Sequence, residues 1–125
     1  MIVLSVESDN TVVEALCRRA ELPCTDRTKA YTAKDGEEVL GFSLFEVGEK
    51  LDFLTVETAP MLWNSIGDGL FRATVNYAIE HGICGARIEK PLLDRVRGNI
   101  VPEKAAAEQI ENCEDFLLAI KRCGH

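Results

Sequence analysis

The chain has 125 residues, of which 46% are hydrophobic and 28% charged, and this length and composition are typical of one folded domain over residues 1–125. Its formal net charge of −7 argues against a nucleic-acid partner, because such partners require a basic surface. No apolar run approaches the roughly 20 residues that span a bilayer, and the first residues lack the basic start of a signal peptide. We therefore expect a cytoplasmic location and no membrane partner.

The cysteines give no sign of a disulfide framework or a metal site. They are five in number, which is odd, and no Cys-x-x-Cys pair or close Cys/His cluster is present. We expect structural or incidental thiols and no bound metal. The residues are Cys17, Cys24, Cys84, Cys113 and Cys123.

The first elements in chain order are a predicted strand and a predicted helix. Residues 1–6 are apolar and β-branched, as in a short strand. Thr11 and Glu14 have the spacing of a capping box, which begins a helix. Pro23 follows the last helical position, residue 21, and closes the helix.

Three strands in succession are predicted next. Residues 29–33 predict a weak strand, and Asp35-Gly36 is a typical hairpin turn. Residues 38–47 are apolar on both faces, as in a central strand that is covered on both sides. In residues 50–57 the apolar positions change face in mid-strand, which indicates a β-bulge. A fully buried strand without a bulge fits that pattern equally well.

A loop, a helix and a parallel strand follow. Residues 58–66 predict a loop, and Gly67-Asp68-Gly69 opens a helix that runs to His81. Glycines at a helix start let backbone N–H groups approach an anion closely. Residues 83–89 predict a strand, and a strand–helix–strand crossover favours parallel pairing.

The last part of the chain predicts one more helix. Residues 90–101 are expected to be irregular. Pro102 suits a first helical turn, and Ile110, Cys113 and Leu117 continue at helical spacing to about Arg122.

Two stretches carry a resemblance to a known family. Asn64-Ser65-Ile66-Gly67-Asp68-Gly69 resembles the acyl-CoA pyrophosphate loop, Gln/Arg-x-x-Gly-x-Gly/Ala, of the GNAT superfamily of N-acetyltransferases. Val39-Leu40-Gly41-Phe42 looks like the central strand of that family, and the order of elements is similar over most of the chain. The resemblance implies an α/β (α+β) fold, a GNAT-like mixed sheet with helices on both faces. The chain departs from it at Asn64, where Gln or Arg is usual, and lacks the final β-hairpin that walls the acceptor side.

The resemblance also implies how acetyl-CoA would be held. Its pantetheine arm would pair with the splayed strand at Thr55, Val56 and Thr58. A backbone N–H near Glu57 or Thr58 would polarise the thioester carbonyl. The pyrophosphate would lie beside Asn64, on the backbone N–H groups of Ile66, Gly67, Asp68, Gly69 and Leu70.

Glu57 is the first candidate for the catalytic base, because it ends the strand beside the expected ligand. Glu89 and Glu46 are weaker candidates, and a solvated surface carboxylate is the alternative for all three. The family often has an acid tyrosine on its last helix, but no tyrosine follows Tyr77 in this chain. Tyr77 itself lies on the apolar face of its predicted helix, as a core residue would.

Four further side chains have two interpretations. Arg72, Arg95 and Arg97 could contact a nucleotide 3′-phosphate or simply be solvated. Trp63 could cover a ligand or cap the core.

The leading hypothesis is an acyl-CoA-dependent N-acetyltransferase that acts on an unidentified small-molecule or peptide amine. The alternative is a degenerate, non-catalytic GNAT-like domain that binds CoA or a protein partner. A third interpretation is a plain α/β domain whose glycines only make a turn. We also expect a homodimer, because a sheet without its closing strands has an open edge.

Overall fold

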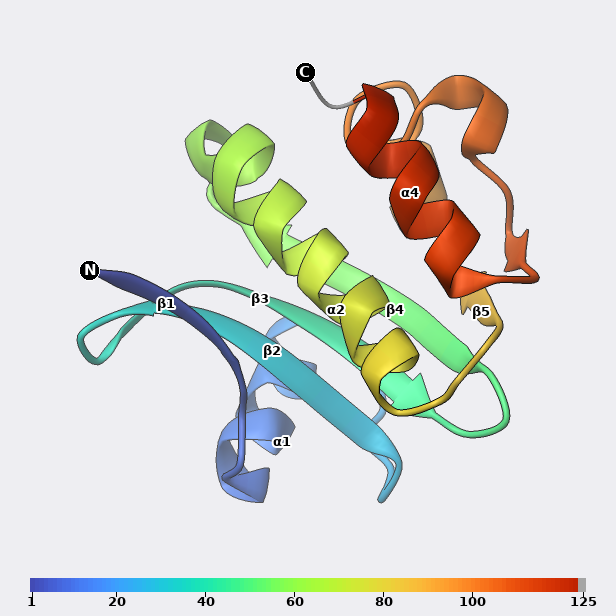
Figure 1. Ribbon diagram of the computed structural model, residues 1–125. Coiled ribbons are helices and arrows are strands. Elements are labelled where there is room, and N and C mark those ends of the chain that lie inside the picture. The colour runs from blue at the N-terminus through green and yellow to red at the C-terminus, as the bar shows by residue number, and fades with distance from the viewer. Residues whose placement is uncertain (124–125) are drawn as a thin grey trace.

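A computed structural model describes residues 1–123 as a six-stranded sheet with helices on both of its faces (Figure 1). The strands and helices confirm the predicted α+β class. In chain order the elements are β1 (Ile2–Val6), α1 (Asn10–Arg19), β2 (Thr28–Asp35), β3 (Glu38–Val47), β4 (Leu51–Thr58), the 3₁₀ turn η1 (Pro60–Leu62), the π-helical turn η2 (Trp63–Gly67), α2 (Asp68–Glu80), β5 (Ala86–Ile88), α3 (Lys90–Val96), the 3₁₀ turn η3 (Glu103–Ala105), β6 (Gln109–Ile110) and α4 (Cys113–Cys123).

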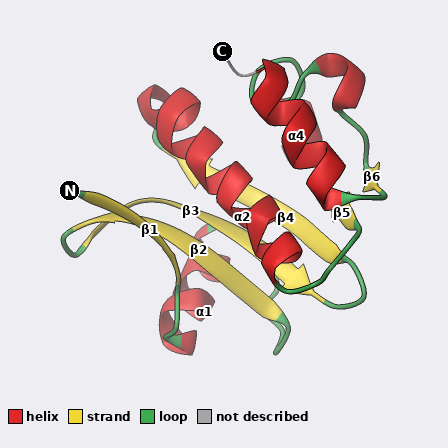
Figure 2. Ribbon diagram, in the orientation of Figure 1, coloured by secondary structure: helices red, strands yellow, loops and turns green. Residues whose placement is uncertain are grey.

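The sheet has the strand order β1-β2-β3-β4-β5-β6. Every pairing is antiparallel except that of β4 with β5, which is parallel and confirms the predicted crossover through α2. Figure 2 shows α1 on one face of the strands and α2 with α4 on the other. The mixed sheet is therefore covered on both sides, as expected.

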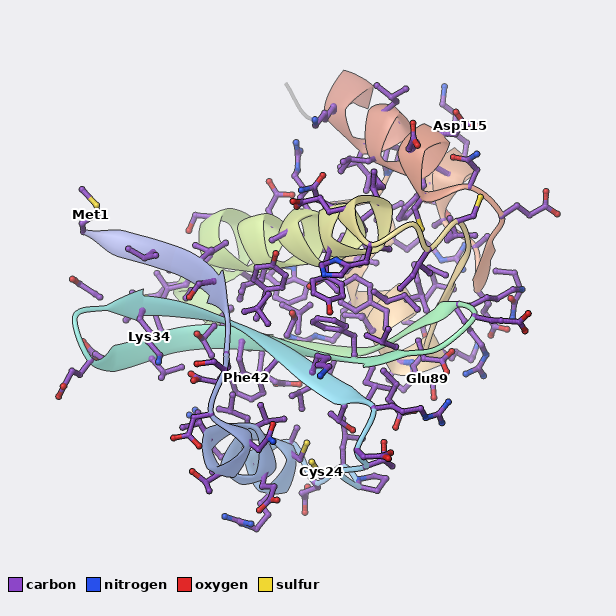
Figure 3. The ribbon with its side chains drawn as sticks, turned by 60° about the horizontal axis from the view of Figure 1, so that its bottom comes forward. Met1, Cys24, Lys34, Phe42, Glu89 and Asp115 are labelled. Carbon is purple, nitrogen blue, oxygen red and sulfur yellow. The ribbon has the colours of Figure 1, made fainter. Side chains whose placement is uncertain are left out.

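The core has two parts, one on each face of the sheet. The larger part lies between the sheet, α2 and α4, where Phe53 stacks on Phe71 with 4.6 Å between ring centroids. The smaller part lies under α1 and includes Leu16, Cys17 and Phe42. Figure 3 shows Phe42 on the side of the sheet that α1 covers. These two layers fix β3 and β4 at the centre of the molecule.

Strand β4 contains the predicted bulge. Its pairing with β3 runs Leu44 to Thr55 and then Phe45 to Phe53, which leaves Leu54 as the extra residue. This confirms the change of face seen in the sequence and is inconsistent with an uninterrupted regular strand. A bulge re-aims the strand that follows it, so residues 55–58 leave the line of the first half of β4.

Helix α1 begins two residues earlier than predicted. Asp9, and not Thr11, is the N-cap, because its carboxylate accepts hydrogen bonds from the Thr11 backbone N–H at 2.9 Å and from the Thr11 hydroxyl at 2.7 Å. A carboxylate at this position satisfies an orphan donor of the first turn as a hydroxyl would. The capping-box prediction was therefore wrong in its details.

Two other segments differ from the prediction. Residues 90–101, expected to be irregular, contain α3, in which Pro91 occupies the first turn. The last helix begins at Cys113 and not near Pro102. The reason is that Ile110 pairs with Ala86 in the sheet instead of joining a helix. No helix among residues 1–123 is both long enough and apolar enough to cross a membrane.

Candidate functional site

Half of β4 has no neighbouring strand on one side. Strand β5 pairs with β4 only from Leu51 to Phe53, and its last contact is the Glu89 N–H donating to the Phe53 carbonyl at 3.0 Å. The chain then turns into α3. We call residues 55–58, on the side away from β3, the open edge of β4. Backbone groups on this edge are available to a partner other than a strand.

The direction of each peptide on this edge follows from one hydrogen bond. The Val56 carbonyl accepts a hydrogen bond from Arg95 on α3. This carbonyl therefore points away from β3, toward the open edge. In an antiparallel strand the N–H and C=O of one residue point the same way, and successive residues alternate. The N–H groups of Val56 and Thr58 therefore point to the open edge, and that of Glu57 points to β3.

Arg95, on α3, contacts both the open edge of β4 and Trp63. Its Nη1 donates to the Val56 carbonyl at 2.8 Å and lies 3.5 Å from Oε2 of Glu57. Its guanidinium carbon lies 4.3 Å from the ring centroid of Trp63. This role was not predicted: from the sequence, Arg95 was either a 3′-phosphate ligand or a solvated side chain. Pro91 was the available signal, because a proline in a first turn would have placed Arg95 one turn into a helix.

Glu57 lies at the end of β4, as the sequence predicted. Its Oε2 accepts a hydrogen bond from the Thr55 hydroxyl at 2.5 Å, and its side chain is 42% exposed. Glu89 pairs with Arg87 and lines the same cavity as Glu57. Glu46 accepts a hydrogen bond from Thr25 and does not line that cavity. The structure thus brings two of the three candidate carboxylates together.

Two cavities lie at the open edge, and Arg95 lines both. One has a volume of about 310 Å³ and includes Thr55, Glu57 and Glu89 in its wall. The other, of about 360 Å³, is lined by Thr58, Pro60, Trp63 and Arg95. Cavities of this size suit small ligands. A guanidinium group therefore separates two spaces that a pair of reactants could occupy.

The segment before α2 is helical, and the predicted loop over residues 58–66 was wrong. The 3₁₀ turn from Pro60 and the π-helical turn from Trp63 continue directly into α2. Within this continuous helix the Asp68 N–H is hydrogen-bonded to the carbonyls of Trp63 and Ser65. A phosphate on this N–H would have to replace those bonds. The local cause is Pro60, whose fixed φ suits a helix start.

The six predicted phosphate-loop residues all lie on this helical segment. Asn64 is exposed, Ile66 and Leu70 point into the core, and Asp68 pairs with Arg72 at 2.9 Å. Gly67 contacts the Trp63 ring, and Gly69 lies beside Leu4. Trp63 and Arg95 connect this set to the strand residues Val56 and Glu57, and both line one cavity with Thr58.

Gly41 brings β3, β4 and α2 close together. A Cβ at Gly41 would lie 2.8 Å from Cγ2 of Thr58 and 3.2 Å from Cδ1 of Leu70. The first distance is shorter than real Cβ contacts and the second is tighter than most of them, so glycine allows this close approach. The glycine of the central strand thus positions the end of β4 against the helix that follows it.

The remaining candidates lie outside the open edge or have structural contacts. Tyr77 packs on Phe45 with 5.0 Å between ring centroids, as expected of a core residue. Arg97 is exposed. Burial raises the pKa of the Cys17 and Cys113 thiols to about 11. Among the described residues no three His, Cys, Asp or Glu side chains gather as metal ligands would.

Comparison with known proteins identifies the fold. No protein-family profile matches the sequence, and no curated protein matches it. Among solved structures, an IAA acetyltransferase from Bacillus cereus ATCC 14579 aligns with a TM-score of 0.54 and 20% identity over 70% of this chain and 65% of its own. A Bacillus subtilis acetyltransferase in complex with CoA aligns with a TM-score of 0.47 and 16% identity over 70% and 62%.

The fold is GNAT-like, as the resemblance implied. The alignment spans less than two-thirds of either solved chain.

Proposed function

We propose that the protein is an acyl-CoA-dependent N-acetyltransferase, which moves an acetyl group from acetyl-CoA to an amine in the cytoplasm. The observation that carries the proposal is the open edge of β4, which begins at a bulge, ends at Glu57 and Thr58 and leads directly into a helix start. The GNAT-like fold supports it. A strand edge offers hydrogen bonds to the amide groups of a pantetheine arm, much as it would to another strand.

In this proposal acetyl-CoA lies on the Trp63 side of Arg95. Its pantetheine arm pairs with the backbone groups of Val56 and Thr58 that point to the open edge, next to Thr55, and its pyrophosphate lies on residues 66–70 beside Asn64. The Thr58 N–H is the donor for the thioester oxyanion. It points to the open edge because Thr58 lies two residues after Val56 and successive residues alternate in direction. The cavity of about 360 Å³ lined by Thr58 and Trp63 supports this placement.

The reaction requires two proton transfers. Glu57 takes a proton from the ammonium form of the acceptor, directly or through a water molecule. The amine lone pair then forms a C–N bond with the thioester carbon, and the C–S bond breaks with its electrons on sulfur. The second amine proton reaches the thiolate, which leaves as CoA thiol. The placement of Glu57 at the end of β4 supports this role, because an exposed carboxylate there can exchange protons with solvent.

A non-catalytic CoA-binding domain is the second candidate. Arg95 already occupies the Val56 carbonyl and pairs with Glu57, and both groups would have to be released for catalysis. A thermal shift with acetyl-CoA followed by CoA-thiol release with a panel of amines separates the alternatives. A ligand at a hundred times its Kd adds about 2.7 kcal/mol of stability. Binding with turnover supports the enzyme, binding without turnover the second candidate, and no binding contradicts both.

A homodimer is part of the proposal. Strand β1 is at one edge of the sheet, and its Ile2, Val3 and Val6 side chains are exposed. The strand has no charged side chain to discourage edge pairing. Sedimentation should show a dimer at tens of micromolar, an order of magnitude at which a specific interface persists. A monomer at that concentration contradicts this part of the proposal.

A further inference from the structure

The cavity on the α1 side of Arg95 has the size and lining of a small-molecule pocket. Its volume is about 310 Å³, which is at the lower end of the range for such pockets. It lies where α1 ends, between the second half of β4 and the first turns of α3. We call it the Leu54 cavity.

The bulge in β4 forms one wall of the Leu54 cavity. Consecutive residues of a regular strand face opposite sides of the sheet. Leu54 and Thr55 nevertheless both line this cavity, because Leu54 is the extra residue of the bulge. Leu54 also packs against the smaller core under α1. The apolar wall of the cavity is thus held by the strand that ends at Glu57.

The interior of the cavity is apolar. One group of side chains comes from the end of α1 and the residues after it, another comes from α3, and one side chain comes from the bulge in β4. None of these side chains can form a hydrogen bond to a ligand. They are Ala20, Leu22, Leu54, Pro91 and Leu92.

The rim of the cavity has an excess of negative charge. Glu57 and Glu89 contribute carboxylates, and Arg95 contributes the one guanidinium group in the lining. Arg95 is engaged by the Val56 carbonyl and the Trp63 ring, and it also lies 3.5 Å from Oε2 of Glu57. Glu89 pairs with Arg87, which does not line the cavity, so the lining itself keeps one negative charge in excess. A ligand ammonium group is therefore favoured at this rim. A ligand carboxylate would meet two like charges and a guanidinium group that already has partners.

We propose that the Leu54 cavity binds the acceptor substrate, and that this substrate is a primary amine carrying one uncharged aliphatic or aryl group. The apolar group occupies the interior, and the nitrogen lies at the rim beside Glu57. A polyamine or an amino acid fits less well, because the interior has no group to pair with a second charge. The role of this amine as the acetyl acceptor rests on the proposed function, whereas its binding in the Leu54 cavity does not.

The test measures amine binding without acetyl-CoA, by titration calorimetry of the whole chain. The probes are isopentylamine, ethanolamine, putrescine and 4-methylpentanoic acid, which separate the apolar group from the charge. Isopentylamine should bind at least tenfold more tightly than each of the others, since a few methylene groups in an apolar pocket give 10- to 200-fold discrimination. Equal affinities, or tighter binding of the acid, would overturn the proposal.

Two variants place the binding in this cavity. Leu22→Asn should weaken isopentylamine binding about tenfold or more, whereas Leu118→Asn, an exposed leucine on α4, should have no effect. Leu22→Phe fills the cavity with an apolar side chain and should also weaken binding, which covers the case in which Leu22→Asn does not fold. Unchanged affinity in a folded Leu22 variant places the amine elsewhere and contradicts the proposal.

The outcomes also separate this inference from the proposed function. Turnover with ethanolamine or putrescine but not isopentylamine would overturn the acceptor class and leave the acetyltransferase intact. Isopentylamine binding that depends on Leu22, without turnover under any condition, would support the cavity and contradict the enzyme.

Discussion

The indole ring of Trp63 lies against Gly67 so closely that a Cβ on Gly67 would come within 2.9 Å of Cε3 of the ring. The backbone of Gly67 is right-handed helical, with φ −60° and ψ −44°, a conformation that any residue can adopt. Glycine is required here for close approach and not for an unusual backbone. Trp63 also contacts Arg95, which binds the Val56 carbonyl at the open edge. Gly67 therefore affects the open edge indirectly, through the position of the Trp63 ring.

Gly67→Val should therefore lower the free energy of unfolding as well as acetyl-CoA affinity. Forcing extra methyl groups into a packed site typically costs about 1–3 kcal/mol. Urea unfolding measures the first effect, and a thermal shift with acetyl-CoA measures the second. Unchanged acetyl-CoA affinity in a folded Gly67→Val protein would contradict the proposed pyrophosphate site.

A matched double variant separates packing from phosphate binding. Trp63→Ala removes the ring that a new side chain would meet, so Gly67→Ala should cost less stability in that background than alone. If the double variant binds acetyl-CoA as well as Trp63→Ala alone does, the glycine acts through packing. If it folds but binds more weakly than Trp63→Ala alone, the backbone at residue 67 is close to the ligand.

Arg95 and Trp63 should show a measurable energetic coupling. A double-mutant cycle with Arg95→Met and Trp63→Leu, followed by urea unfolding, should give a coupling of about 0.5–1 kcal/mol. The lower part of that range is expected because the Arg95 side chain is 41% exposed. Arg72→Met is the control, since Arg72 pairs with Asp68. Additive effects of Arg95→Met and Trp63→Leu would contradict the contact.

Glu57→Gln should lower kcat by about 10²–10⁴ and leave acetyl-CoA affinity nearly intact, because the proposed mechanism uses this carboxylate for proton transfer and not to hold acetyl-CoA. Steady-state kinetics and a thermal shift measure the two effects. Glu89→Gln is the matched control, since it also lines the Leu54 cavity but follows β5. An unchanged kcat in Glu57→Gln would mean that another group accepts the proton.

Glu7 should make stability depend on pH. Its side chain is 8% exposed, and the hydrogen bond from Lys34 Nζ at 2.9 Å lowers its pKa below the usual 4.5. A carboxyl whose pKa is lower in the folded state stabilises the fold above its unfolded pKa, and this stabilisation is lost as pH falls through the folded pKa. Glu7→Gln should thus cost about 1.5 kcal/mol at pH 7, and this difference from the parent should decline below pH 4.5.

Urea unfolding between pH 3 and 7 measures that difference. The control is the same substitution in a Lys34→Met background, in which the pH dependence of the Glu7→Gln effect should largely disappear. A pH-independent effect in the parent background would mean that Glu7 contributes through packing alone.

The cysteines at positions 17, 24, 84 and 113 should react in two groups. Burial raises the pKa of Cys17 and Cys113 to about 11, whereas Cys24 and Cys84 are exposed. At pH 8 a thiol of pKa 11 is ionised to only about one part in a thousand, and the thiolate is the nucleophile. Iodoacetamide followed by peptide mass mapping should modify Cys24 and Cys84 first. Equal labelling of Cys17 would indicate that the end of α1 opens.

The parts that could be predicted from sequence are those with a local signal. The bulge is visible as a change of apolar phase around Leu54, and Asp35-Gly36 marks the turn between β2 and β3. Glu57 could be placed because it ends a strand. These features depend on a few adjacent residues, so a single sequence contains them.

The parts that could not be predicted depend on contacts between distant residues. Ile110 has helical spacing to Cys113, but its pairing with Ala86 decides that it belongs to the sheet. The role of Arg95 depends on the packing of α3 beside β4, and no residue spacing in the sequence predicts that packing.

The parallel pairing of β4 with β5 has a consequence for the order of folding. The hairpins of β2 with β3 and of β3 with β4 close over short turns, so their loop-closure entropy is small. The contact of Phe53 with Ile88 must wait until α2 has crossed the sheet, and such non-local pairings form slowly. The open edge of β4 is defined only after β5 has paired with the first half of β4. We therefore expect the antiparallel strands β2, β3 and β4 to be ordered before the candidate site forms. In pulse-labelled hydrogen exchange, the amides of β3 should become protected before those of β5.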